Sequence, residues 1–143
     1  MEINKELLDG LLAEAKENPR LRQNFDLRTS SADTSQRMLN ALQPQTEVPI
    51  HRHENTAETV ICLVGKLEEI IYEEVNEYVH EATSCCDDVI RQKNFKEVSR
   101  QILSPAEGKF GIQIPAGAWH TINVIEPSVI FEVKDGAYRG DDR

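Results

Sequence analysis

Two histidines two residues apart, followed by an acid and a β-rich run, constrain this chain more than any other feature. His51 and His53 leave the same face of an extended chain, because side chains alternate with a period of two. After a short polar stretch that suits a turn, Glu58 opens a run over residues 59–64, which Gly65 ends. Folded as a hairpin, this segment returns Glu58 to the histidines. Two imidazoles and a carboxylate form a ligand set that suits a divalent transition metal.

A second stretch, PAGAWHTINV, supplies a third imidazole. Pro115 and Gly117 favour a tight turn, and His120 follows at the start of another β-rich run. His120 can meet the first three ligands only if two strand pairs face each other, as in a small barrel or sandwich. The sequence therefore predicts a mainly β fold in which the metal ligands are His51, His53, Glu58 and His120.

The spacing of both stretches resembles the cupin superfamily. The first fits the motif HxH, four residues, Glu, six residues, Gly, and the second fits the core motif PxGxxH. More narrowly, segments such as ETVICLVGKLEEIIYEE and FGIQIPAGAWHT resemble the WbuC-type cupins, over roughly residues 5–140. The resemblance implies a single-domain cupin, a double-stranded β-helix or jelly-roll barrel that binds a metal. It also implies a link with surface-polysaccharide biosynthesis, without supplying a reaction.

The predicted ligand set leaves one or two positions open on a six-coordinate ion, which then acts as a Lewis acid or activates water. It admits one divalent ion of Fe, Mn, Ni, Co or Zn, and spacing does not select among them. Two functions stay open, because the fold hosts both. One is a metal-dependent enzyme acting on a small molecule such as a sugar or sugar-nucleotide, as an isomerase, epimerase or oxygenase. The other is a non-catalytic small-molecule-binding or sensor cupin.

Candidate substrate contacts lie beside the two motifs. Residues 36–43, QRMLNALQ, read as a strand whose polar side chains suit either a pocket or an edge. The WbuC-type resemblance includes Gln36, Arg37 and Asn40. Two aromatic residues are added: Tyr72 follows the first motif, and Trp119 lies within the second. The candidates are Gln36, Arg37, Asn40, Tyr72 and Trp119. No separate acid or base is assigned, because Glu58 is occupied as a ligand.

We expect one domain with three parts: an N-terminal helix and connecting segment over 1–35, the barrel over 36–138, and a tail over 139–143. Residues 3–17 carry an apolar stripe at helical spacing, with Asn4 as a candidate cap. This stripe favours a helix packed on the outside of the barrel over one that binds a partner.

The region between the motifs is less regular. Residues 73–93 are long and polar for a link between barrel strands, which predicts an insertion or a short helix. Cys85 and Cys86 lie there and are interpreted as free thiols in a loop. Cys62, within the apolar run, is interpreted as a small buried residue on the same face as Glu58.

The net charge of −9 argues against nucleic acid and anionic membranes as partners, because both require clustered Lys and Arg. Three cysteines without a signal peptide predict a reducing, cytoplasmic location, and no run is long enough to span a membrane. A small-molecule ligand is the expected partner. Because cupins commonly pair through sheet edges, the resemblance also implies a homodimer.

Overall fold

The computed structural model describes residues 1–81 and 88–136, and the side chains among them except those within 78–92. Cys85, Cys86 and residues 139–143 lie outside the described residues. The elements in chain order are α1 (Lys5–Glu17), β1 (Arg22–Asp26), β2 (Ser35–Leu42), β3 (Glu58–Glu81), β4 (Asp88–Leu103), the short 3-10 helix η1 (Pro105–Glu107), β5 (Gly111–Ile114) and β6 (Trp119–Asp135). The strands form one antiparallel sheet in the order β1-β2-β6-β3-β4, and β5 also pairs with β3. The predicted mainly β, single-domain barrel with an N-terminal helix is confirmed.

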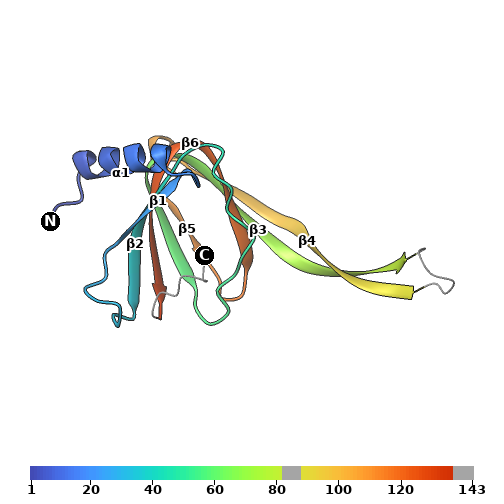
Figure 1. The fold of residues 1–143 in the computed structure, drawn as a ribbon. Helices are drawn as coiled ribbons and strands as arrows, with labels where there is room; N and C mark the ends of the chain where they lie inside the picture. Colours follow the sequence, from blue (N-terminus) through green and yellow to red (C-terminus); the bar gives the residue numbers. More distant parts are fainter. Residues whose placement is uncertain (82–87, 137–143) are drawn as a thin grey trace.

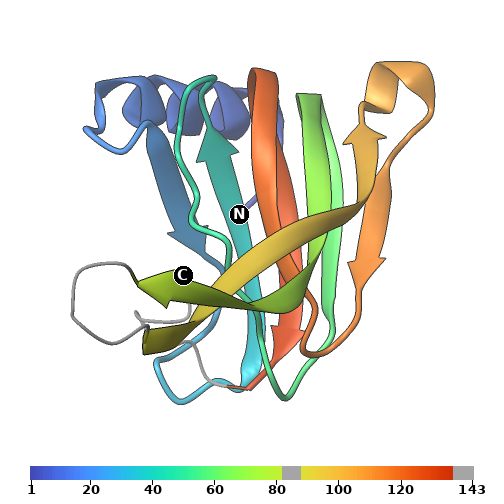
Figure 2. The ribbon, with the colours of Figure 1, turned by 90° about the vertical axis from the view of Figure 1, so that its right-hand side faces the viewer.

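Two long strands, β3 and β6, form the frame of the barrel (Figures 1 and 2). The second part of β6 lies between β2 and the start of β3, whereas its first part pairs with β3 beyond Gly65. Both strands therefore contribute to two parts of the sheet. The register between them shifts repeatedly from Cys62 to Leu67, where the sheet turns a corner.

Gly65 makes this corner possible. Its φ is +96°, and a Cβ atom there would lie 2.2 Å from the carbonyl oxygen of Pro127. Only glycine lets the two backbones approach so closely. The β-rich run of residues 59–64 ends at this corner, and β3 continues beyond Gly65.

The helix α1 packs on the outer face of β1, β2 and β6, at one end of the barrel (Figure 1). Asn4 caps it by accepting a hydrogen bond from the backbone N–H of Leu7 at 3.0 Å. Leu11 and Ala15 are buried against an apolar layer formed by Leu39, Ala41 and Val129. The apolar stripe thus packs on the barrel, as expected.

The opposite faces of the same strands line the interior. Its apolar part is a cluster that contains Leu42, Val60, Cys62, Leu67, Leu103, Ile114, Val124 and Ile130. At one end of the interior, a polar row crosses three strands. Lys134 on β6 pairs in register with Gln36 on β2 and with Glu58 on β3. Gln36 and Lys134 share the inward faces of their strands with Leu42 and Ile130, because side chains alternate along a strand.

Two segments differ from expectation. The connecting segment contains β1, which pairs with β2 from Arg22↔Leu42 to Asp26↔Met38; its few apolar residues gave no periodic signal. The described part of residues 73–93 is the end of β3 and the start of β4, and it contains no helix. This two-stranded ribbon projects beyond the barrel in Figure 1, which explains why its sequence lacks a core-facing apolar pattern.

Candidate metal centre

Backbone hydrogen bonds bring the two histidine stretches together. The N–H of His51 donates to the carbonyl of His120 at 3.0 Å, and the N–H of His120 donates to that of His51 at 2.8 Å. The turn before His120 is tied in as well, since the N–H of Gly117 donates to the His53 carbonyl at 2.8 Å. Gly117 has a φ of +81°, which a turn of this shape requires of glycine. The fold itself therefore places the histidines side by side.

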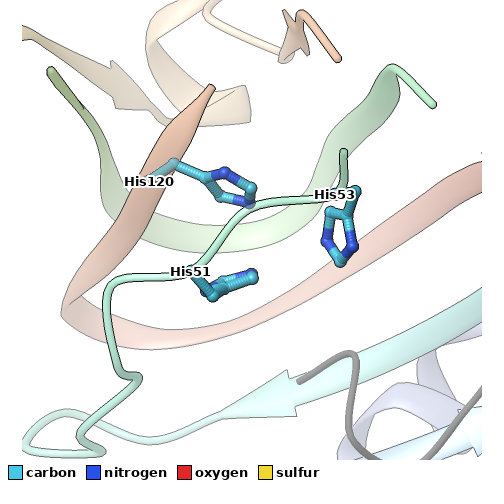
Figure 3. A group of neighbouring side chains, drawn as sticks. All are labelled: His51, His53 and His120. Carbon is cyan, nitrogen blue, oxygen red and sulfur yellow. The ribbon is translucent and has the colours of Figure 1, made fainter. Parts of the chain in front are cut away.

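The three imidazoles point into one space (Figure 3). One ring nitrogen from each of His51, His53 and His120 lies within 4.8 Å of the others. Glu58, at the start of β3, completes the group: its Oε2 lies 3.2 Å from His53 Nε2 and 3.3 Å from His120 Nε2. Glu58 is 1% exposed, and His53 and His120 are also buried.

Backbone carbonyls orient two of the rings. His51 Nδ1 lies 2.9 Å from the Pro49 oxygen, and His120 Nδ1 lies 2.9 Å from the Ala118 oxygen. A carbonyl only accepts, so each Nδ1 is assigned as the donor, and this tautomer leaves Nε2 of His51 and of His120 available to coordinate an ion. An acceptor at the second nitrogen is a common feature of metal-binding histidines.

The donor set fits a divalent metal ion. Donors about 2.1 Å from an ion lie about 3.0 Å apart when adjacent and about 4.2 Å apart when opposite. The two contacts of Glu58 already have the adjacent spacing, and the 4.8 Å limit on the histidine donors requires only a small closure. Within the described part of the chain, His120 Nε2 is buried and makes no hydrogen bond. A buried acceptor of this kind suits coordination.

A cavity of about 580 Å³ opens beside the histidines, a size that suits a small-molecule site. It is lined by Gln36, Ile50, His51, Arg52, His53, Glu54, Asn55, Thr56, Trp119, Lys134, Asp135 and Gly136. Any ion held by the three histidines and Glu58 would thus be accessible to a ligand entering from solvent.

Trp119 forms a fixed part of the cavity wall. Arg52 lies over its ring at 4.6 Å and pairs with Glu54 at 2.6 Å, and the ring of Phe95 lies 4.9 Å away. Nearby, the ammonium of Lys93 lowers the pKa of Glu74, with smaller contributions from Arg52 and Trp119. These contacts hold the wall at the base of the β3–β4 ribbon.

The other predicted substrate contacts are distributed unevenly. Gln36 lines the cavity together with Trp119. Asn40 is fully buried deeper in the barrel, and Tyr72 lies beside Phe95 with ring centroids 6.5 Å apart. Arg37 faces the opposite side of β2 from Gln36 and pairs with Asp33 at 3.0 Å. Of the five candidates, Asn40, Tyr72 and Arg37 do not line the cavity.

The sequence analysis missed Lys134. Its Nζ lies 3.3 Å from His53 Nε2, and the residue is 8% exposed. In the sequence SVIFEVK, strand alternation puts Val129, Phe131 and Val133 on one side of β6 and leaves Glu132 and Lys134 on the other. A barrel strand whose apolar face lies under a helix must turn its other face inward, and this was the available signal.

Comparison with solved structures shows which fold this chain shares. The chain resembles KdgF from Halomonas sp. at 15% identity and a TM-score of 0.54, over 84% of this chain and 82% of that one. It resembles TT1209 from Thermus thermophilus at 20% identity and a TM-score of 0.59, over 95% and 98%. It also resembles E. coli YcfD, a ribosomal oxygenase solved with cobalt and 2-oxoglutarate, at 16% identity and a TM-score of 0.52, over 95% of this chain but only 30% of YcfD. The structural neighbours are cupin-fold proteins, and this chain has the cupin fold.

Sequence comparison defines the family. The chain belongs to the family described as "Domain of unknown function (DUF6016)", whose model matches residues 3–83. No curated protein matches it. Among the described residues, none of the helices is both long and apolar enough to cross a membrane.

Proposed function

We propose that this protein is a metal-binding cupin in which His51, His53, Glu58 and His120 hold one divalent transition metal ion. The observation that carries the proposal is the buried contact of Glu58 Oε2 with two histidine nitrogens, beside a third histidine. The two ring orientations set by backbone carbonyls support it. The cobalt in the YcfD structure is consistent with such a site in this fold.

We propose further that the site serves a metal-dependent enzyme acting on a small molecule. When bound, the ion would supply a Lewis acid with open coordination positions. The chain's own residues would then bind and orient the substrate: Trp119 forms the wall, and the polar side chains of the cavity contact its oxygens. Access from the cavity to the ligand set favours this function over a non-catalytic binding or sensor cupin, which remains the alternative.

The finer assignments rest on resemblance. We propose membership of the WbuC-type group, a sugar or sugar-nucleotide ligand in surface-polysaccharide biosynthesis, and isomerase, epimerase or oxygenase chemistry. We propose a homodimer formed through sheet edges and a cytoplasmic location. The division of the chain into an N-terminal segment (1–35), a barrel (36–138) and a tail (139–143) is also proposed.

Metal reloading tests the proposal. Protein stripped with a chelator would be titrated separately with Fe(II), Mn(II), Ni(II), Co(II) and Zn(II) while Tm is recorded. At least one ion should raise the Tm of the wild type and leave that of His53→Ala unchanged, because a ligand that binds only the folded state stabilises it. Equal responses in both proteins would refute the site.

Turnover separates the two functions. The loaded protein would be incubated with a panel of sugar nucleotides in large excess and followed by NMR. Product beyond one equivalent supports an enzyme, whereas saturable binding without conversion supports the binding module.

A further inference from the structure

Lys134 lines the cavity with a buried amine, directly beside the proposed metal ligands. It is 8% exposed, whereas the acidic residues that line the same cavity, Glu54 and Asp135, are exposed. Glu54 is also paired with Arg52 at 2.6 Å. Of the two Lys and Arg residues that line the cavity, Arg52 is exposed and Lys134 is buried, in a protein whose net charge is −9.

The ammonium cannot keep its present contact once a metal is bound. Lys134 Nζ lies 3.3 Å from His53 Nε2, and a nitrogen lone pair cannot both accept a hydrogen bond and coordinate an ion. Metal binding must therefore displace Nζ from His53. Because Lys134 lines the cavity, its flexible side chain can reorient into that space, toward whatever occupies the open coordination positions.

Gln36 provides a second, independent indication of a ligand. It is paired with Lys134 across the β2–β6 register and lines the same cavity. Gln36 is 4% exposed, and among the described residues its Oε1 has no hydrogen-bond partner. A buried acceptor left unsatisfied is costly, and a ligand that donates a hydrogen bond would remove that cost.

We propose that Lys134 and Gln36 select a small hydroxylated carboxylate as the ligand of this site. The carboxylate would accept a hydrogen bond from Lys134, and a hydroxyl would donate to Gln36 Oε1, while the ligand's remaining oxygens face the ion. This inference rests on the metal site proposed above and deepens it by naming the chemical class of the ligand. The competing role for Lys134 is that of a countercharge to Glu58, its neighbour across the β3–β6 register, or to Glu132 on the same strand face.

Three probes of similar size separate these roles: D-glycerate, which has both groups, propionate, which lacks hydroxyls, and glycerol, which lacks the carboxylate. The chain has a single tryptophan, Trp119, and it lines the cavity, so its fluorescence reports binding directly. The metal content of each sample is measured beforehand. With the metal-loaded wild type, glycerate should bind most tightly, propionate more weakly, and glycerol least.

The variants make the test specific. Lys134→Met should weaken glycerate binding at least about tenfold, because a hydrogen bond to a charged group is lost, while metal content stays at the wild-type level. Gln36→Leu should weaken glycerate but not propionate. Lys66→Met is the matched control, since Lys66 pairs with Glu107 and does not line the cavity. Should Lys134→Met fold poorly, Lys134→Arg, which keeps the charge, should bind glycerate more tightly than Lys134→Gln.

Three results would overturn the inference. Lys134→Met could bind glycerate as tightly as the wild type, or it could lose its metal, which would make Lys134 a structural part of the metal site. The metal-loaded wild type could also bind neither carboxylate. A wild type that holds no metal contradicts the proposed metal site instead, so the two failures are distinguishable.

Discussion

His51 and His120 exchange backbone hydrogen bonds in both directions, at 3.0 and 2.8 Å, although they belong to different motifs. This isolated bridge fixes the spacing of two metal ligands through the backbone rather than through an ion. The site is therefore preorganised, and loss of a histidine side chain should affect metal binding more than folding.

His51→Ala tests this separation. The backbone bridge does not depend on the imidazole, so the circular dichroism spectrum should match that of the wild type while bound metal falls to a small fraction. A chelator should lower the Tm of the wild type and leave that of the variant unchanged. Loss of the β-sheet signal in the variant would contradict a backbone-held site.

Glu58→Gln tests the carboxylate. The amide has nearly the same shape, but it lacks the negative charge that lies 3.2 and 3.3 Å from the two histidine nitrogens. We expect metal affinity to fall at least about tenfold, measured by competition with a fluorescent chelator. Glu126→Gln, at an exposed position on β6, is the control and should bind metal normally. Normal affinity in Glu58→Gln would remove Glu58 from the ligand set.

Gly65→Ala tests the corner of the barrel. The added methyl group would lie 2.2 Å from the Pro127 oxygen, and φ is +96°, so the free energy of unfolding should fall by about 2 kcal/mol or more. Gly10→Ala in α1 is the matched control. A Cβ there meets nothing within 4 Å, so helix propensity should raise stability by about 1 kcal/mol. Urea unfolding measures both, and equal effects would contradict the close approach.

Cys62 predicts a dependence of stability on pH. Burial raises the pKa of its thiol from 9.0 to about 11 in the folded protein. The folded state thus retains a proton that the unfolded chain releases, so this contribution to stability is complete below pH 9 and is lost as the pH rises to about 11. The free energy of unfolding should therefore fall more steeply over this range in the wild type than in Cys62→Ala. Parallel curves would show that the thiol does not contribute.

The sequence was sufficient to predict which residues could converge. The spacing of His51, His53 and Glu58, with His120 after a Pro-Gly turn, encodes both the strand positions and the donor types, and these are local properties of the chain. Geometry required only a small barrel or sandwich that brings the two stretches face to face, and the resemblance of both stretches to the cupin motifs implied the cupin barrel. The acceptors of the histidine Nδ1 atoms could not be predicted, since backbone carbonyls carry no sequence signal.

The sequence did not reveal the role of residues whose position depends on which face of a strand points into the barrel. By its sequence, Lys134 belongs to the polar face of β6, which is normally the solvent face. Because the apolar face, with Val129 and Phe131, packs against α1 on the outside, the polar face points into the barrel. Arg37 was included by resemblance. It faces away from the cavity because it follows Gln36 on β2 and neighbouring side chains of a strand point to opposite faces. An insertion or a short helix was expected over residues 73–93, and the strands of the β3–β4 ribbon were not, because strands that leave the core lose the periodic pattern on which prediction depends.

Elemental analysis tests the central claim most directly. Protein purified without an affinity tag or chelator would be compared with the double variant His53→Ala/His120→Ala, purified in parallel. We predict about one equivalent of a divalent transition metal per wild-type chain and almost none in the variant. A wild type without metal that also gains no stability from any added ion, or a variant that retains the full equivalent, would contradict the metal centre.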